Sequence, residues 1–396
     1  VAEARRGGAG GGGGGGNAGR LLGLKGGGGM RTKEQISSGQ MSVLFFCFMT
    51  GSSIVNIPGP LIGYAKKGAW ISLLLSLSIG MALLACVMYL YRKYPARDFI
   101  EHGNAAIGKW MTALLAIPFL AFQFHMTSGI VLDIGLFMTT TMMRQTPIIL
   151  FLFFVYFVVA LTVRSGIETM ARMFFIPICS VVVSIVVILV LSYPNYKPEH
   201  LLPLMPDGMK PIALGTYFAY GFPYSELVLI TMLLPYVRKE KQGHLHRGMY
   251  LALLVNGLFL IAVTLSTILV FGPMSEERNY SMFEVARTVD LFVVIQRIES
   301  LVGISLIMAS FMKASITLAA LNLTITRLFN LKDDRILIFP VTLICFLLSM
   351  VQIENGFAFW SNAVGVIHPL WGTVSFALPL LIVATGSAIR RQPTAE

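Results

Sequence analysis

The chain has 396 residues, of which 56% are hydrophobic and 12% are charged, and its mean hydropathy is +0.75. A soluble protein would not carry so apolar a composition, so we expect a polytopic membrane protein. The net charge is +11. Because the basic residues stand in short loops between apolar segments, they indicate membrane orientation and contact with lipid headgroups rather than nucleic-acid binding.

The first 29 residues are rich in glycine and lack the apolar core of a signal peptide. This composition predicts a disordered extension. Because Met30 opens a segment of ordinary composition, we expect the natural start at Met30 and a transmembrane, transporter-like domain over residues 30–396.

A bilayer core about 30 Å thick needs roughly 20 apolar residues per helix. By this measure the sequence predicts ten spans, near residues 40–63, 70–91, 110–138, 147–163, 173–193, 212–235, 249–271, 296–329, 336–352 and 358–389. A proline-rich connection separates helices 1–5 (about 40–193) from helices 6–10 (about 212–389). Because five is an odd number, the halves have opposite topology. The expected fold is therefore an all-α, five-plus-five inverted repeat.

Lysine and arginine near the span ends are distributed unequally between the two sides. Seventeen fall on the side of Met30 and eight on the other. The excess predicts that both termini are cytoplasmic. On the same side, residues 98–110 predict a short amphipathic helix at the membrane surface.

The sixth span is interrupted by Gly221 and Pro223. A membrane helix tolerates such a break only where the backbone lines a protein cavity or water. The first span is interrupted in a corresponding place by Thr50-Gly51-Ser52-Ser53 and by Pro58-Gly59-Pro60. Paired breaks in the two halves are typical of a transporter's substrate site, because half-helix ends present free N–H and C=O groups.

We therefore expect a binding site between the two breaks. Its predicted walls are Thr50, Gly51, Ser52 and Ser53 on one side and Tyr220, Gly221, Phe222 and Pro223 on the other. The alternative for Gly51 and Ser52 is close helix packing, which small residues also permit in membranes.

Four stretches carry a resemblance to a known family: Lys33 to Gln40, Gly166 to Arg172, Gly221 to Glu226 and Leu233 to Tyr236. The sequence from Met30 to about Arg391 resembles the spore germination protein family. This family is the integral-membrane B-type subunit of nutrient germinant receptors, within the amino acid-polyamine-organocation transporter superfamily.

The resemblance implies ten helices in the inner membrane of a spore and two partner subunits, one a membrane subunit with a soluble domain and one a lipoprotein. It also implies a small nutrient, usually an amino acid, bound between helices 1, 3, 6, 8 and 10. It leaves open whether the nutrient is moved or only sensed.

Two ionisable residues fall inside apolar spans, where they are costly unless paired or hydrated. Glu226 could hold an ammonium group or a proton, or could make a structural bond to a neighbouring helix. Lys313, in the eighth span, could form an ion pair with Glu226 or Asp133. In sodium-coupled relatives of the resembled fold, helices 1 and 8 hold a cation, and the Lys313 ammonium could stand in its place.

The third span carries His125 and Asp133, which share a helix face, with Gln123 and Phe124 near it. They could form a water or ion path or contribute to the substrate site, although a lone histidine in a bundle often bonds a neighbouring backbone. Glu168 lies four residues from Arg172 and could be a gate, a subunit contact or a surface charge pair.

We find no nucleophile triad, Walker loop or dinucleotide fingerprint, and expect no enzyme activity, no catalytic residue, no cofactor and no metal site. The leading hypothesis is a nutrient-sensing subunit of a spore germinant receptor. The alternatives are a proton- or sodium-coupled amino acid permease and a conduit for water or ions.

Overall fold

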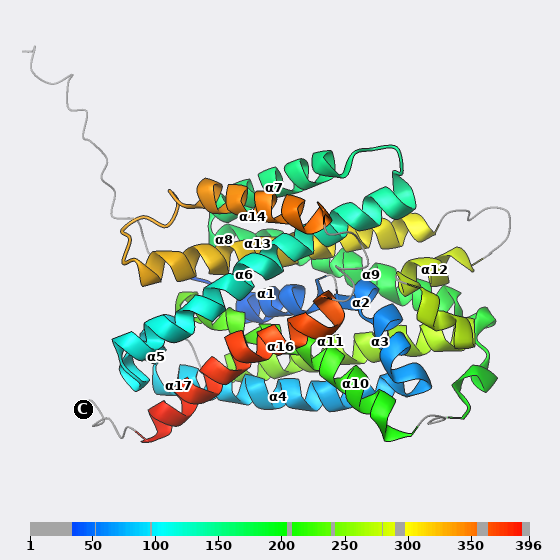
Figure 1. Cartoon of the computed structure of the whole chain (residues 1–396), viewed down its shortest axis with the longest axis horizontal. Coiled ribbons are helices and arrows are strands. Elements are labelled where there is room, and N and C mark those ends of the chain that lie inside the picture. The colour runs from blue at the N-terminus through cyan, green and yellow to red at the C-terminus, as the bar shows by residue number, and fades with distance from the viewer. Residues whose placement is uncertain are drawn as a thin grey trace, which may run out of the picture. The chain divides into compact units, whose positions relative to one another are not determined.

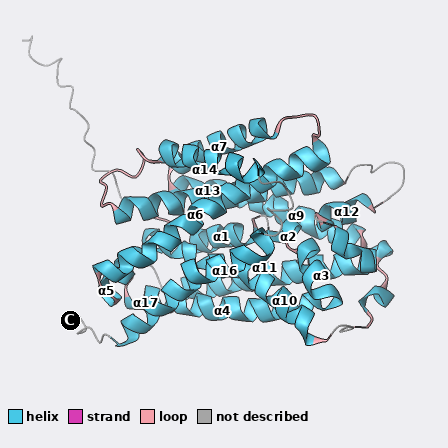
Figure 2. Ribbon diagram, in the orientation of Figure 1, coloured by secondary structure: helices cyan, strands magenta, loops and turns pink. Residues whose placement is uncertain are grey.

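The computed structural model describes residues 34–51, 53–95, 97–203, 208–238, 242–278, 280–289, 298–354 and 363–389. Within these ranges the regular secondary structure is helical, as Figure 2 shows, with one isolated backbone bridge between Ile36 and Val237. The expected all-α fold is confirmed. The glycine-rich extension lies outside the described residues.

Seven helical runs in the described part of the chain are long and apolar enough to cross a membrane: Pro58–Lys93, Lys109–Met142, Ile148–Ser165, Ile167–Leu191, His244–Glu276, Glu299–Leu328 and Gly365–Ile389. Two shorter apolar helices, Ser38–Thr50 and Ile338–Glu354, correspond to parts of the expected first and ninth spans. The expected sixth span is divided into short pieces. The structure thus has a multi-pass architecture, and the count of ten spans stays a prediction.

The α-helices of the membrane domain follow one another closely along the chain (Figure 1). They are α1 (Ser38–Thr50), α2 (Ser53–Asn56), α3 (Pro58–Ala65), α4 (Ala69–Lys93), α5 (Phe99–Ala106), α6 (Lys109–Phe137), α7 (Ile148–Ser165), α8 (Ile167–Met173), α9 (Phe175–Leu191), α10 (Met209–Ala219), α11 (Gln242–Phe271), α12 (Ser281–Arg287), α13 (Glu299–Leu328), α14 (Ile338–Glu354), α16 (His368–Gly372) and α17 (Leu378–Ile389).

The first span begins with a reciprocal cap and ends early. Ser37 Oγ accepts a hydrogen bond from the Gln40 amide, and the Gln40 side chain accepts one from the Ser37 amide. The helix stops at Thr50, because Gly51 has non-helical backbone angles. Helix α3 then starts with Pro58 at its first position, where a missing N–H costs little. The expected interruption of helix 1 is confirmed.

The sixth span is interrupted in the place that its glycine and proline predict. Helix α10 leads into a π-helical turn, Tyr220–Tyr224, in which Phe222 has φ −137° and ψ 107°. The chain continues as a 3₁₀-helix, Ser225–Met232. Pro223 has no N–H to donate, so a regular ladder cannot continue through it. Helix 6 is therefore broken, as expected.

Helix α1 lies among the other helices, with α11 and α13 packed against it (Figure 1). Its side chains Phe45, Phe48 and Met49 are completely buried. Helix α6 packs along α13 and α14, and α10 packs against α3 and α4. The broken segments of helices 1 and 6 are consequently surrounded by longer, continuous helices.

The short helix predicted between the second and third spans is α5. Asp98 caps it by accepting from the Glu101 amide, and Glu101 accepts from the Asp98 amide. From the last turn of α13, Arg327 Nε lies 2.9 Å from Asp98 Oδ2. This ion pair fastens α5 to the end of α13.

The chain segment before α1 is tied to the end of helix 6 by its backbone. The Ile36 amide donates to the Tyr236 carbonyl at 2.9 Å, and the Arg238 amide donates to the Ile36 carbonyl at 3.0 Å. Nearby, Glu34 Oε2 accepts from the Ile167 amide at 2.8 Å, at the start of α8. These contacts join three parts of the chain at one end of the bundle.

Candidate functional site

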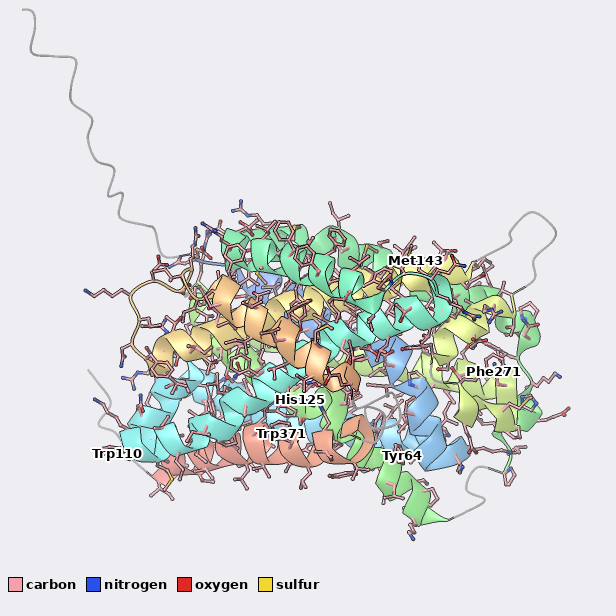
Figure 3. All side chains as sticks on the ribbon, turned by 45° about the horizontal axis from the view of Figure 1, so that its top comes forward. Tyr64, Trp110, His125, Met143, Phe271 and Trp371 are labelled. Atoms are coloured by element: carbon pink, nitrogen blue, oxygen red, sulfur yellow. The ribbon has the colours of Figure 1, made fainter. Side chains whose placement is uncertain are left out.

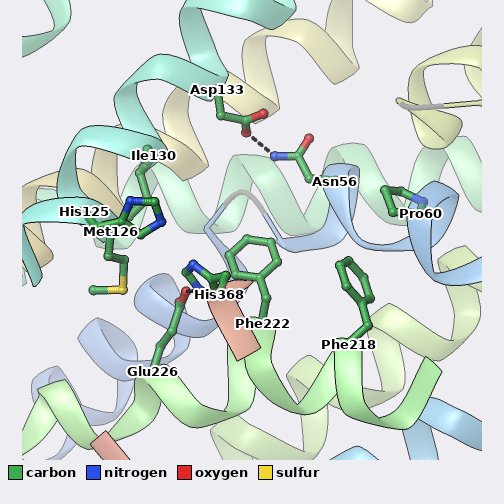
Figure 4. Close-up of a pocket in the computed structure, with 11 residues that line it drawn as sticks. Asn56, Pro60, His125, Met126, Ile130, Asp133, Phe218, Phe222, Glu226 and His368 are labelled. Carbon is green, nitrogen blue, oxygen red and sulfur yellow. Dashed lines mark hydrogen bonds and ion pairs between the residues drawn. The ribbon is translucent and has the colours of Figure 1, made fainter. Parts of the chain in front are cut away.

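A cavity of about 80 Å³ lies between the second part of helix 1, the break in helix 6 and α6 (Figure 4). One water needs about 10 to 15 Å³ on this measure, so the cavity could hold several waters or a small organic molecule. The side chains and backbone that line it come from helices 1, 3, 6 and 10: Asn56, Pro60, His125, Met126, Gly129, Ile130, Asp133, Phe218, Phe222, Glu226 and His368.

Glu226 lies at the centre of a buried charged cluster. Its Oε2 is 2.6 Å from Lys313 Nζ, and neither side chain is exposed. The attraction between the two opposite charges is strong at this distance, because no solvent reaches either side chain. His368 Nε2 lies 3.0 Å from Glu226 Oε1. The ion pair expected as one alternative for Lys313 is thus formed with Glu226 and joins helices 6 and 8, while His368 connects helix 10 to the same carboxylate.

The Lys313 side chain reaches both broken helices. Its Nζ lies 4.5 Å from the ring centroid of Phe222, in the break of helix 6, and 5.6 Å from that of Phe48, in α1. Its aliphatic carbons lie directly against Gly51, where a Cβ atom would come within 2.5 Å of Lys313 Cδ. The lysine therefore fills the space between the two breaks.

Asp133 belongs to a different wall of the cavity. The Asn56 side-chain amide donates a hydrogen bond to Asp133 Oδ2, so residues of helix 1 and helix 3 meet here (Figure 4). His125, two turns earlier on α6, stacks on Trp371 with ring centroids 4.9 Å apart, and Figure 3 shows the two residues close together. Its ring centroid is 5.8 Å from that of His368.

The structure thus brings four of the predicted site residues, His125, Asp133, Phe222 and Glu226, to one cavity. Thr50 and Gly51 instead line a second space of about 10 Å³, against α9 and α13. Ser53 is buried and donates to the Met49 carbonyl. Ser52 lies outside the described residues.

The other residues predicted for the substrate site do not line the cavity. Gln123 is buried and accepts a hydrogen bond from Thr324 at 3.2 Å, while Phe124 is partly buried against the core. Tyr220 accepts from Thr373, and Gly221 lies directly against Pro369. Pro223 is buried beside the cavity-lining Phe222.

Glu168 lies away from this site. It forms an ion pair with Arg172 at 2.5 Å, and the arginine side chain is 68% exposed. Of the alternatives for Glu168, this geometry favours a charge pair at the surface. Among the described residues, no group of three or more histidine, cysteine, aspartate or glutamate side chains could hold a metal ion.

Several lining residues are absent from the predicted set, above all Asn56, Pro60 and Phe218. Asn56 is a polar residue within the interrupted first span, and Phe218 stands one turn before Phe222, so each had a local signal. His368 is a histidine within the expected tenth span, but nothing in the sequence placed it beside Glu226.

A family model described as "Spore germination protein" matches residues 35–358. The chain belongs to this family. Relatives from Bacillus subtilis (strain 168) include spore germination protein KB, 25% identical over 370 residues, which are 91% of this chain and 97% of that protein. Spore germination protein YndE is 21% identical over 88% of this chain and 96% of its own length. Family members are permease-like membrane proteins rather than enzymes.

Solved transporters share the fold of this spore germination family member. MhsT in complex with L-phenylalanine aligns with a TM-score of 0.68 at 15% identity, over 91% of this chain and 94% of MhsT. Mhp1, a nucleobase-cation-symport-1 family transporter, aligns with a TM-score of 0.66 at 12% identity, over 89% and 78% of the two chains. A Na⁺-coupled sialic acid symporter aligns with a TM-score of 0.65 at 10% identity, over 87% of this chain and 81% of the symporter. At these identities the similarity shows the fold.

Proposed function

We propose that this chain is the nutrient-sensing membrane subunit of a spore germinant receptor, and that it binds a small molecule, an amino acid by our expectation, in the cavity beside the two helix breaks. One observation carries the proposal: residues just after the break in helix 1 and residues in the break of helix 6 line the same cavity. Broken helices supply both backbone donors and acceptors, which a zwitterionic nutrient needs.

The similar transporters support a small-molecule site in this fold. The MhsT structure holds L-phenylalanine, and the Mhp1 structure holds bromovinylhydantoin. The cavity of this chain has apolar walls from Met126, Ile130 and Phe222 and polar groups from Asn56 and Asp133. Such a mixture is typical of small-molecule sites, where a few polar groups orient a ligand among apolar side chains.

The charged cluster supplies a route from ligand to conformational change. A ligand in the cavity contacts Phe222 and Glu226, and these residues contact Lys313. Lys313 packs in turn on Gly51, at the break of helix 1. A ligand that favours a different spacing of the two breaks would therefore shift helices 1, 6 and 8 together. In the proposed receptor, this shift is passed to two partner subunits in the spore inner membrane, one with a soluble domain and one a lipoprotein.

Binding is tested with the purified full-length chain in nanodiscs, by measuring its thermal unfolding with each of the twenty amino acids. We expect at least one to raise the unfolding temperature, and a Phe222→Ala variant to lose that response. Failure of every amino acid and of simple sugars to alter the unfolding of a folded sample would refute the proposal. A host strain lacking this chain should lose germination in that nutrient while still growing on it.

A coupled amino acid permease is the second candidate, favoured by the ion pair that links helices 6 and 8 beside the break in helix 1. In this version, Lys313 takes the place of a coupling cation and the site opens alternately to the two sides. Concentrative, sodium-independent uptake of labelled amino acid into liposomes that contain this chain alone would favour the permease. Leak of water or ions without uptake would favour a conduit.

A further inference from the structure

The cavity contains two carboxylates with different surroundings. Glu226 is paired with the Lys313 ammonium at 2.6 Å and with the imidazole of His368 at 3.0 Å. Its negative charge is therefore matched within the protein. Asp133 bonds the neutral amide of Asn56 and, among the described residues, has no lysine, arginine or histidine nitrogen within salt-bridge distance, although the Lys313 ammonium also attracts it from farther away. Two carboxylates of the cavity therefore share one ammonium group, and Asp133 is the one without direct contact to it.

The two carboxylates lie at different ends of the cavity. Figure 4 shows Asp133 with Asn56 at one side of the drawn residues and Glu226 at the other, with His368 and the ring of Phe222 between them. Asp133 stands in the last third of the apolar run Lys109–Met142, where a carboxylate without a paired cation is costly. The Asn56 hydrogen bond orients the carboxylate, but an amide does not neutralise its charge.

The walls beside Asp133 suit an organic cation. Ile130, one turn before Asp133, and the rings of Phe218 and Phe222 line the same cavity. Apolar and aromatic walls stabilise the carbon skeleton of a ligand, and aromatic rings attract an ammonium group by the cation–π interaction. A ligand with an ammonium group at one end and an apolar part at the other would satisfy both features.

We propose that Asp133 is the specificity-determining residue of this cavity and that it selects ligands carrying a positively charged amine, with Asn56 as the positioning residue for its carboxylate. The inference rests on the proposed function and narrows the class of ligand to molecules with an amine. The Asp133 carboxylate on helix 3 recognises the amine, in addition to the backbone groups of the two breaks. A ligand that lacks the amine leaves Asp133 unmatched.

The test compares matched probes on the full-length chain in nanodiscs. Three sets are used: phenylalanine, phenethylamine and 3-phenylpropionate; leucine, isoamylamine and 4-methylpentanoate; alanine, ethylamine and propionate. Dissociation constants are measured by calorimetry in a buffer whose only added cation is potassium, and again with sodium chloride. We expect at least one amino acid or amine to bind, and its deaminated acid to bind roughly ten- to hundredfold more weakly, as for loss of a charged hydrogen bond.

The decisive variant is Asp133→Asn, which keeps the size of the side chain and a partner for Asn56. It should bind the amine-bearing probe roughly ten- to hundredfold more weakly and should no longer distinguish it from the deaminated acid. Asp133→Glu, which restores the charge, should recover part of the preference. Glu168→Gln, at the distant surface pair, is the matched control and should leave every constant unchanged.

Each contrary outcome has its own meaning. Equal binding of amine and deaminated acid by the unaltered chain, or an undiminished preference in a folded Asp133→Asn variant, overturns this inference while the proposed cavity stands. Binding of sodium alone that disappears in Asp133→Asn, with no preference for amines, makes Asp133 an inorganic cation site and also overturns it. If no amino acid or amine binds while a simple sugar raises the unfolding temperature, this inference is rejected and the proposed binding cavity stands. If no amino acid, amine or sugar binds, both are rejected.

Discussion

Lys313 Nζ and Glu226 Oε2 lie 2.6 Å apart, with both side chains completely buried and on different helices. Removal of one member leaves the other as an unmatched charge in a medium that cannot hydrate it, which typically costs about 3 to 5 kcal/mol. We therefore expect Lys313→Met to lower the thermal stability of the purified chain strongly. Lys313→Met combined with Glu226→Gln removes both charges and should recover a large part of that loss. If the single and double variants unfold at the same temperature, the pair contributes no coupling.

Gly51 provides a test of how closely the Lys313 stem packs on the break in helix 1. In Gly51→Ala the new Cβ would lie 2.5 Å from Lys313 Cδ and 2.8 Å from Lys313 Cβ. Overpacking of this kind costs about 1 to 3 kcal/mol. Gly63→Ala is the matched control, because no atom lies within 4 Å of its added Cβ and alanine favours the surrounding helix α3. The unfolding temperature should fall in Gly51→Ala and not in Gly63→Ala. Equal unfolding temperatures of the two variants would contradict the close packing of Lys313 on Gly51.

The surroundings of His102 predict that the stability of helix α5 depends on pH. Its Nε2 donates to the Tyr94 carbonyl at 3.1 Å, while Nδ1 is buried without a partner among the described residues. Burial lowers the pKa of His102 from 6.5, and the nearby Arg97 adds to this effect. The unfolded chain therefore binds a proton before the folded chain does. The stability contributed by neutral His102 is complete above pH 6.5 and is lost as pH falls from there toward the lowered pKa.

Hydrogen exchange of the α5 amides, corrected for intrinsic rates, checks this prediction between about pH 7.5 and about pH 5.5. Protection should fall with pH in the unaltered chain and change less in His102→Gln, which retains a donor and does not titrate. Burial raises the pKa of the Asp98 carboxyl group, so protonation of Asp98 on acidification acts in the opposite sense and favours the folded state. A pH response of equal size in both proteins would exclude His102 as its source.

Glu34 should contribute more to local stability than Glu168, although both are glutamates with an arginine partner. Glu34 accepts from the Ile167 amide at 2.8 Å and lies 3.3 Å from Arg335, so its replacement by alanine removes a helix cap and an ion pair. We expect Glu34→Ala to weaken the protection of the α8 amides by about 1 to 2 kcal/mol. Glu168→Ala removes an exposed pair with Arg172, typically about 0.3 to 0.5 kcal/mol. Hydrogen exchange distinguishes the two, and equal effects would contradict this ranking.

The sequence predicted the helix breaks and the buried charged residues, because neither fits an uninterrupted apolar helix. Gly221 and Pro223 cannot belong to an uninterrupted membrane helix, and Glu226 and Lys313 cannot lie there unpaired, so each was visible without coordinates. Which residue would pair with Lys313 depends on how the helices rotate and cross, and periodicity does not determine this. The structure resolves the choice between Glu226 and Asp133 in favour of Glu226.

The same limitation explains the residues of the cavity that sequence reasoning missed. Thr50 and Gly51 stand at the break itself and face α9 and α13, whereas Asn56, farther along the same broken segment, faces the cavity. A helix break in the sequence shows which segment lies near the site. Which side chains of that segment face the cavity depends on the backbone conformation after the break. Phe218 and His368 reach the cavity because their helices pack against that turn, a contact between segments far apart in sequence.

The backbone bridge between Ile36 and the residues around Val237 has a further implication. Because its two hydrogen bonds join main-chain atoms, replacing the side chains of this stretch, proline apart, would not by itself sever the link. Whenever the last turn of helix 6 is displaced, the stretch preceding α1 must travel with it or detach. A spectroscopic probe beside Ile36 would then register displacements of helix 6, and a proline at position 36, which removes the first of the two hydrogen bonds, should weaken that signal.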